Sequence, residues 1–140
     1  MLSDAQFIVV LMFVHYVADF LLQTSWMANN KSKSLLPLTT HILVYSLTVG
    51  VGFAWILSAR LSDTLTIAEL TNRVVEFTVI NGSLHFGIDY VTSRCSSKLF
   101  AAGRIGDAFK VIGFDQFLHA LCLILTYDAF TTYNWSCTGC

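Results

Sequence analysis

Long apolar segments dominate this chain of 140 residues. A helix that crosses a bilayer needs about 20 predominantly apolar residues. Four segments approach or exceed that length, over residues 5–23, 38–59, 74–91 and 111–130. Only 12% of the residues are charged, which is about half the share found in soluble domains. The sequence therefore predicts an all-α integral membrane protein, a four-helix bundle forming a single domain over residues 1–140.

The third segment is the least apolar of the four, because it contains Glu76, Asn81, His85 and Asp89. A hydropathy window alone is expected to miss it. Residues 62–73, which precede this segment, mix polar and apolar side chains and predict an interfacial helix lying on the membrane. The lipid bilayer is thus the first expected partner. The net charge of −1 argues against nucleic-acid binding.

Basic residues predict the orientation, because Lys and Arg concentrate in cytoplasmic loops. Six of the eight Lys and Arg residues lie in the loops after the first and third segments, and two lie between the second and third segments. The first and third loops are therefore predicted to be cytoplasmic, with both termini on the outer side of a multi-pass protein.

All four histidines lie inside the apolar segments, and three have an aspartate four residues away. This spacing places both side chains on one face of a helix. In this orientation the four histidines and three aspartates all fall in one layer near the cytoplasmic face. The orientation depends on Lys and Arg alone, so the shared layer is an independent observation. Buried charges are costly unless they are paired or bound to a metal. The seven residues are His15, Asp19, His41, His85, Asp89, Asp115 and His119.

The two halves of the chain repeat one pattern: a His-x3-Asp pair, a basic loop, then a histidine in the next segment. The repeat predicts two helical hairpins related by a pseudo-two-fold axis along the membrane normal. Each hairpin would contribute half of one site, as at the repeat interfaces of transporters.

Imidazole and carboxylate groups are ligands of zinc, iron and manganese. The seven residues are therefore predicted to hold a divalent metal, with zinc as the first choice and manganese or iron as alternatives. They suffice for one metal or for two that share a carboxylate. Asp19, Asp89 and Asp115 are also the candidate catalytic residues, because a carboxylate that is not a ligand can act as a general base.

Six further polar residues are predicted to orient the ligands or to bind substrate. For the uncharged ones the alternative role is hydrogen bonding between helices. The two lysines are predicted either to capture an anionic substrate or only to set the membrane topology and contact lipid headgroups. The six residues are Gln23, Tyr45, Asn81, Gln116, Lys31 and Lys98.

Several of these motifs together resemble a known family. They are the run His15-Tyr-Val-Ala-Asp19-Phe-Leu-Leu-Gln23, then His41, the run His85-Phe-Gly-Ile-Asp89, and the run Asp115-Gln116-Phe-Leu-His119. In this order they resemble a family of small bacterial and phage membrane proteins catalogued as domain of unknown function 3307. The resemblance reaches to about Leu125, and the tail with Cys137 and Cys140 is not part of the pattern.

The resemblance implies a small helical protein of the bacterial inner (cytoplasmic) membrane, or of the host membrane if phage-encoded, and both termini would then be periplasmic. It supplies no reaction. The His-x3-Asp pattern is also similar to that of another bacterial membrane family, which is labelled metal-dependent hydrolase.

Three functions remain open on these observations. The leading one is a metal-dependent membrane hydrolase whose site opens toward the cytoplasm and takes a membrane or anionic substrate. The second is a proton or metal-ion pathway, although the outer halves of the segments carry few polar residues. The third is a non-enzymatic phage or bacterial interaction protein in which the His and Asp cluster is structural. Four helices barely enclose a site, so a homodimer is compatible with all three.

Overall fold

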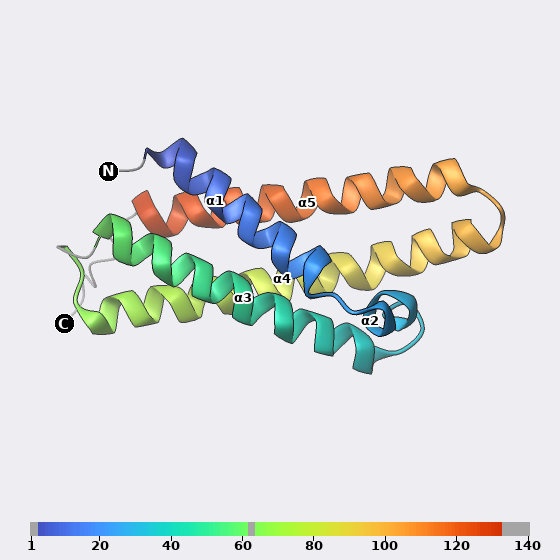
Figure 1. Ribbon diagram of the computed structural model, residues 1–140, viewed down its shortest axis with the longest axis horizontal. Coiled ribbons are helices and arrows are strands. Elements are labelled where there is room, and N and C mark those ends of the chain that lie inside the picture. Colours follow the sequence, from blue (N-terminus) through green and yellow to red (C-terminus); the bar gives the residue numbers. More distant parts are fainter. Residues whose placement is uncertain (1–2, 62–63, 133–140) are drawn as a thin grey trace.

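The computed structural model describes residues 3–61 and 64–132, and every regular element in those ranges is a helix. α4 packs on α5 and on α3, and α3 packs on α1. α4 and α5 run antiparallel along the long axis, whereas α1 and α3 cross them obliquely (Figure 1). The elements are α1 (Asp4–Tyr16), η1 (Val17–Leu21), α2 (Ser25–Asn30), α3 (Leu35–Leu61), α4 (Ile67–Ala101) and α5 (Ile105–Thr132).

Three of these segments are long and apolar enough to cross a membrane: Asp4–Leu21, Leu35–Leu61 and Ile105–Thr132. α4 is not apolar enough to be among them. This agrees with the polar residues that the sequence places in the third segment. The 35 residues of α4 correspond to about 52 Å, well beyond the roughly 30 Å thickness of a hydrocarbon core. Part of α4 therefore extends past any bilayer that the other helices cross.

Residues 67–73 of the predicted interfacial helix form the first two turns of α4, and their place at a membrane surface stays a prediction. Residues 62 and 63 lie outside the described part of the chain. A capping box starts the helix: the Thr66 side chain accepts the backbone N–H of Glu69, and the Glu69 carboxylate accepts that of Thr66 at 2.8 Å. The mixed polar sequence therefore continues into the third apolar segment without a break.

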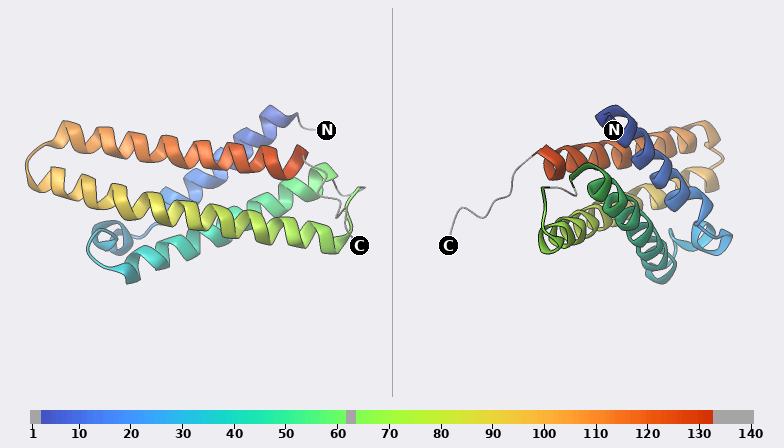
Figure 2. Two further views of the ribbon diagram at one scale, coloured as in Figure 1. Left: turned by 180° about the vertical axis from the view of Figure 1, so that it is seen from behind. Right: turned by 60° about the vertical axis from the view of Figure 1, so that its left-hand side comes forward.

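The two helices of the second half are also longer at their joined ends than the apolar segments predict. Residues 92–101 are polar but contain no helix breaker, so α4 continues to Ala101 and α5 begins at Ile105. Gly103 turns the chain between them with a φ of 70°, the left-handed conformation that glycine adopts at helix ends. The turn projects past the other helices, at the end of the molecule where α2 also lies (Figures 1 and 2).

The inward faces of the long helices change character along their length. At the end away from α2 they carry apolar side chains, and Phe53 and Phe77 stack there with ring centroids 3.7 Å apart. Phe130 packs edge-on against both rings. On α1 the buried face begins with Phe7 and Leu11 and then changes to histidine and aspartate. Aromatic side chains therefore fill one end of the helical assembly, and polar side chains fill the other.

Glycines allow two helix pairs to approach closely. A Cβ atom added to Gly52 of α3 would lie 2.7 Å from a methyl carbon of Val14 in α1. Similar overlaps would occur between Gly50 and Thr78 and between Gly82 and Ser46, where α3 meets α4. These contacts fix how deeply α3 lies between its two neighbours.

Replacing Gly52 by alanine is expected to lower the free energy of unfolding by about 1–3 kcal/mol, because the stiff β-branched Val14 cannot rotate away. Thermal unfolding in detergent, followed by circular dichroism, measures the change. Gly113 is the matched control, since a Cβ atom there meets nothing within 4 Å. Gly113→Ala is expected to leave the protein equally stable or to stabilise it by up to about 1 kcal/mol. Equal midpoints for the two variants would contradict the packing argument.

Candidate functional site

The seven predicted His and Asp residues lie together at the polar end of the bundle. Each residue is buried, and none is more than 7% exposed. Five different elements supply them, so the cluster joins the two halves of the chain. Their role as ligands stays a prediction. The residues are His15 in α1, Asp19 in η1, His41 in α3, His85 and Asp89 in α4, and Asp115 and His119 in α5.

Asp19 lies in the π-helical turn η1, where α1 widens before it ends. The backbone N–H of Leu22 donates to the carbonyl of Val17 at 2.9 Å, five residues back. Such turns are frequent at functional sites. The chain then leaves the helix and brings Gln23 to the cluster, where its amide nitrogen lies 3.2 Å from His41 Nε2.

Two ring nitrogens, from α3 and α4, each lie close to the same two carboxylate oxygens, from η1 and α4. His41 Nε2 lies 3.0 Å from Asp19 Oδ1, 3.1 Å from His85 Nε2 and 3.4 Å from Asp89 Oδ2. His85 Nε2 lies 3.4 Å from the same oxygen of Asp19 and 3.6 Å from the same oxygen of Asp89. We call His41, His85, Asp19 and Asp89 the four-ligand set.

Hydrogen bonding alone cannot satisfy this arrangement. A neutral imidazole Nε2 carries either one proton or one lone pair. His41 Nε2 nevertheless faces two carboxylate oxygens, a second ring nitrogen and the Gln23 amide group. Two buried carboxylates also approach each ring nitrogen, and of the two only Asp89 has an ammonium group beside it, that of Lys31.

A metal ion suits these atoms, and the ligand-type atoms of Asp19, His41 and His85 all lie within 4.8 Å of one another. A tetrahedral zinc ion with bonds of about 2.0–2.1 Å holds its ligand atoms about 3.3–3.4 Å apart. The five distances within the four-ligand set run from 3.0 to 3.6 Å. Two imidazole nitrogens and two carboxylate oxygens also form a chemically ordinary zinc donor set.

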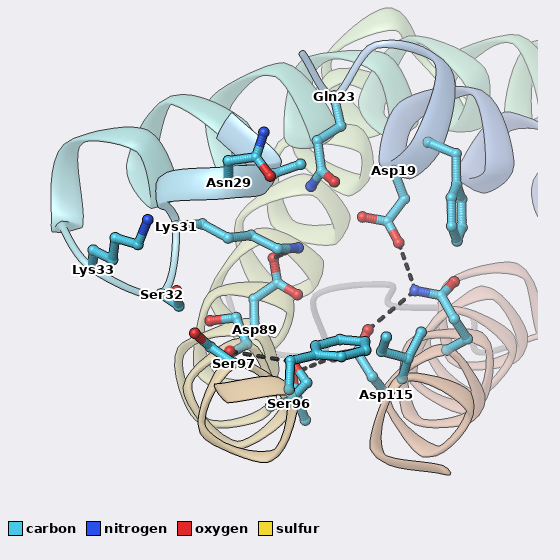
Figure 3. A pocket seen from close by; sticks show the side chains of 17 residues that line it. Asp19, Gln23, Asn29, Lys31, Ser32, Lys33, Asp89, Ser96, Ser97 and Asp115 are labelled. Atoms are coloured by element: carbon cyan, nitrogen blue, oxygen red, sulfur yellow. Dashed lines mark hydrogen bonds and ion pairs between the residues drawn. The ribbon is translucent and has the colours of Figure 1, made fainter. Parts of the chain in front are cut away.

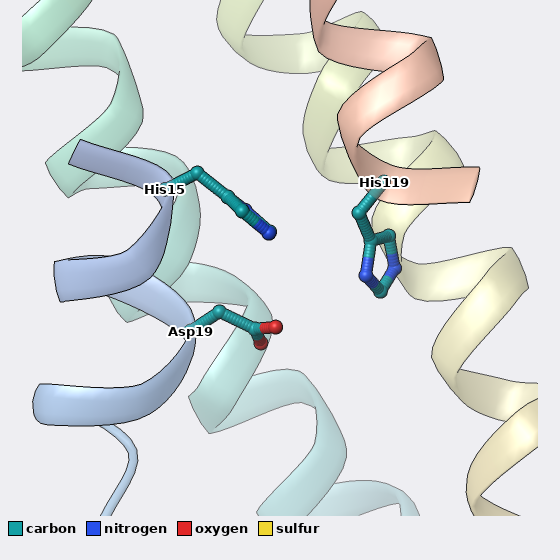
Figure 4. A group of neighbouring side chains, drawn as sticks. All are labelled: His15, Asp19 and His119. Carbon is teal, nitrogen blue, oxygen red and sulfur yellow. The ribbon is translucent and has the colours of Figure 1, made fainter. Parts of the chain in front are cut away.

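His15 and His119 form a second group with Asp19, shown in Figure 4. Ligand-type atoms of these three residues lie within 4.8 Å of one another. The His119 ring stacks on His85 with centroids 3.9 Å apart. Neither of its ring nitrogens has a hydrogen-bond partner among the described residues. Because Asp19 belongs to both groups, one carboxylate lies between two positions that suit a cation.

Gln116 and Thr92 hold the remaining carboxylate, Asp115. The Gln116 amide nitrogen donates to Asp19 Oδ2 at 2.8 Å and to Asp115 Oδ2 at 3.1 Å, and its carbonyl oxygen lies 3.3 Å from His15 Nε2. The Thr92 hydroxyl donates to the other oxygen of Asp115. Asp115 is thus fixed next to the four-ligand set without belonging to it.

An open cavity of about 370 Å³ reaches the three carboxylates from the end of the bundle where α2 lies. Asp19, Asp89 and Asp115 line its floor, and residues of η1, α2, α4, α5 and the loop after α2 form its walls. In Figure 3 the ammonium group of Lys31 lies beside Asp89, and Lys31 Nζ donates to Asp89 Oδ2 at 2.8 Å. The buried cluster is therefore reachable by a small polar molecule.

The structure brings four of the six further predicted residues to this cluster. Gln23, Gln116 and Lys31 contact it as described, and Tyr45 stacks on His85 with ring centroids 3.8 Å apart. The other two lie elsewhere. The Asn81 amide donates to the Phe77 carbonyl at 2.9 Å and to the Thr126 hydroxyl at 3.0 Å, so it links α4 to α5. Lys98 is exposed and does not line the cavity.

Sequence reasoning missed the hydroxyl groups that line the cavity along α4. Thr92, Ser93, Ser96 and Ser97 all contribute to its wall. Their spacing places them on one face of a helix, one turn beyond Asp89. That spacing could have indicated a polar helix face. It was missed because the third segment was predicted to end at residue 91, before these residues.

Comparison with known proteins identifies the family but no activity. A family profile described as "Protein of unknown function (DUF3307)" matches residues 7–139. The chain belongs to this family. The match confirms the resemblance that the motifs indicate, and it continues past Leu125 into the tail that the motif pattern left out. Cys137 and Cys140 of that tail lie outside the described residues. No curated protein and no solved structure matches the chain.

Proposed function

We propose that this protein is a membrane-embedded, metal-dependent hydrolase of the bacterial inner membrane, or of the host membrane if it is phage-encoded. α1 with η1, α3, α4 and α5 cross the bilayer, and both termini are periplasmic. α2 and the α4–α5 turn then lie on the cytoplasmic side. Their position at one end of the molecule and the six Lys and Arg residues that follow the first and third apolar segments support this orientation.

One observation carries the metal centre: His41 Nε2 and His85 Nε2 lie 3.1 Å apart, and each lies 3.0–3.6 Å from the same oxygens of Asp19 and Asp89. These residues would hold a divalent ion, with zinc as the first choice because the distances suit its tetrahedral shell. Two of the ligands come from each half of the chain, although His41 and His85 are not equivalent positions of the repeat. His15 and His119 would hold a second ion that shares Asp19, or else support the first.

Asp115 is the proposed general base. It lines the cavity beside the four-ligand set, and Thr92 and Gln116 hold its two oxygens. In hydrolysis a water oxygen bonds to the carbon or phosphorus of an ester, and the bond from that atom to the leaving alcohol oxygen breaks. Asp115 would take the proton from the water, and the leaving alcohol would regain a proton. A bound divalent ion would lower the pKa of the attacking water.

The apolar end of the bundle favours this one-sided site over a proton or ion pathway. Phe7, Phe53, Phe77 and Phe130 fill the space between the helices beyond the cluster. A pathway would need polar groups or water through that region. The cavity, in contrast, is lined by residues of α2 and of the loop after it, at the other end of the molecule.

Elemental analysis of the purified chain tests the metal centre. We expect one or two zinc ions per chain after dialysis in detergent, and the count decides whether His15 and His119 hold a second ion. Because the terminal cysteines can bind zinc on their own, the measurement is made on the double variant Cys137→Ser, Cys140→Ser. Less than about 0.1 metal per chain, after loading with zinc, manganese or iron, would exclude the metal centre.

Incorporation of oxygen-18 from labelled water tests the hydrolase. The metal-loaded protein is incubated with a bacterial lipid extract, and the products are examined by mass spectrometry. We expect a product that carries the label with the wild-type chain and none with Asp115→Asn, whose metal content should be unchanged. A metal-loaded protein that labels no product would favour the non-enzymatic alternative, in which the cluster is structural.

A further inference from the structure

The cavity next to the cluster has a chemical character of its own. We infer that it is a phosphate-binding subsite and that the substrate of the proposed hydrolase is a phosphate ester. The inference rests on the proposed metal centre, because the bound ion would supply positive charge. The residues that support the inference are not the proposed metal ligands. They lie in α2, in the loop that follows α2 and on the outer part of α4.

The walls of the cavity are rich in hydrogen-bond donors. Two ammonium groups, from Lys31 and Lys33, lie on the side of the loop after α2 (Figure 3). Ser93, Ser96 and Ser97 of α4 also line the cavity, and each carries a hydroxyl group. A phosphate group offers three terminal oxygens to such donors, whereas a carboxylate offers only two. The number of donors therefore favours phosphate over a carboxylic acid.

One of these hydroxyl groups has no partner of its own. Ser93 Oγ is shielded from solvent and forms no hydrogen bond with the described residues. The Ser96 hydroxyl donates to the Ser93 carbonyl at 3.2 Å, so it has a local partner. A buried hydroxyl without a partner lowers stability unless a ligand or water supplies one. Ser93 lines the cavity, where a phosphate oxygen would supply that partner.

The charges around the cavity make anion binding depend on the metal. Three carboxylates and two lysines line it, which gives a net charge of −1 from −3 and +2. A divalent ion in the four-ligand set changes this sum to +1. The cavity thus repels an anion when metal-free and attracts one when metal-loaded.

Lys31 connects the two sites. Its Nζ atom lies 2.8 Å from Asp89 Oδ2, and the same oxygen faces His41 Nε2 and His85 Nε2. A phosphate group next to the metal would therefore lie within reach of the Lys31 ammonium group. Lysine binds phosphate as a point charge, so Lys31 suits this role without a fixed geometry.

The rim of the cavity also has apolar side chains, from Phe20, Phe100 and Ile112. Phe20 is 49% exposed, and the adjacent Leu21 is 61% exposed. These residues suit the apolar part of an amphiphile. A lipid phosphate and a soluble phosphate ester nevertheless share the headgroup chemistry, so the experiment must distinguish these two sources.

Titration of inorganic phosphate into the detergent-solubilised protein tests the inference, with phosphorus NMR or calorimetry as the readout. We expect the zinc-loaded chain to bind phosphate at least tenfold more tightly than the metal-free chain. Lys31→Ala and Lys33→Ala should each weaken binding several-fold or more, with zinc content unchanged. Lys33 is exposed at the rim, so its replacement does not endanger the fold. Linkage requires phosphate to raise the zinc affinity by the same factor as zinc raises the phosphate affinity.

Lys98→Ala is the matched control, because Lys98 lies on α4 near the serines but does not line the cavity. It should bind phosphate like the wild-type chain. If the zinc-loaded Lys31, Lys33 and Lys98 variants all bind phosphate equally, the phosphate subsite is wrong while the metal centre stands. If the wild-type chain binds no metal, both proposals fail.

Competition identifies the source of the phosphate group. Vesicles with phosphatidic acid, a lipid phosphate monoester, are compared with phosphatidylcholine vesicles and with soluble glycerol phosphate. Displacement of bound phosphate by phosphatidic acid vesicles alone supports a lipid substrate. Displacement by glycerol phosphate supports a soluble phosphate ester. Failure of both compounds to displace it would overturn the proposal that the substrate is a phosphate ester.

Discussion

His85→Ala is expected to reduce the zinc affinity of the protein by at least about 100-fold. Losing a residue that only orients a ligand already costs about 10–100-fold in metal affinity, and His85 is a proposed ligand itself. Its ring lies at the centre of the cluster: Nε2 faces His41, Asp19 and Asp89. Its ring also stacks between Tyr45 and His119. Alanine removes the donor atom and the support for the neighbouring rings together.

Competition with a chromophoric chelator in detergent measures the affinity. Asn81→Leu is the control, since Asn81 is buried on α4 one turn before His85 and bonds to Thr126 instead of the cluster. It removes a buried polar group of similar size and should keep the wild-type zinc affinity. Circular dichroism shows whether both variants remain helical. A helical His85→Ala protein that still binds zinc with the wild-type affinity would show that the metal is held elsewhere.

That the histidines and aspartates meet in one layer could be predicted from the sequence, because this depends on local spacing. Asp lies four residues from His on one helix face, and the helices alternate in direction, so residues near the ends of successive segments meet in one layer. His15, His41 and His85 all follow this rule. The rule needs only the helix period and the positions of the loops, and both can be read directly from the sequence.

The choice of ligands could not be predicted in the same way. Which nitrogen faces which oxygen depends on how closely the helices approach and at what angle they cross. Gly50 and Gly82 set the approach of α3 to α4, and the π-helical turn sets the position of Asp19. Neither effect has a reliable signal in one sequence. Asp115 therefore had the same expected role as Asp19 and Asp89, although it lies outside the four-ligand set.

The ends of the helices were missed for a different reason. Hydropathy marks where a segment leaves the hydrocarbon region, but a helix continues in water as long as its residues allow it. The stretch from Thr92 to Ala101 is polar and helical, and its serines form one wall of the cavity. The serines, which are the residues most informative about the substrate, thus lie beyond residue 91, where the apolar segment ends.

Removal of the metal by a chelator is expected to lower the thermal midpoint by about 10 °C. A ligand that binds only the folded state stabilises it by about 4 kcal/mol when present at 1,000 times its Kd. For a chain of this size that corresponds to roughly 8–16 °C. The physical cause is the cluster itself: without a cation, Asp19 and Asp89 place two carboxylates against the same two imidazole nitrogens in a buried site. Unfolding in detergent, followed by circular dichroism with zinc and with chelator, measures the shift.

The His85→Ala protein separates this effect from zinc bound elsewhere. Its midpoint should not respond to zinc or to chelator, because the four-ligand set is incomplete. The double variant Cys137→Ser, Cys140→Ser should respond like the wild-type chain. If His85→Ala shows the full wild-type shift, or if the wild-type chain shows none, the cluster is not what the metal stabilises. The nitrogens of His119, which form no hydrogen bond with the described residues, would then need another explanation, with the neighbouring Asp115 carboxylate, 3.5 Å from Nδ1, and buried water as the first alternatives to test.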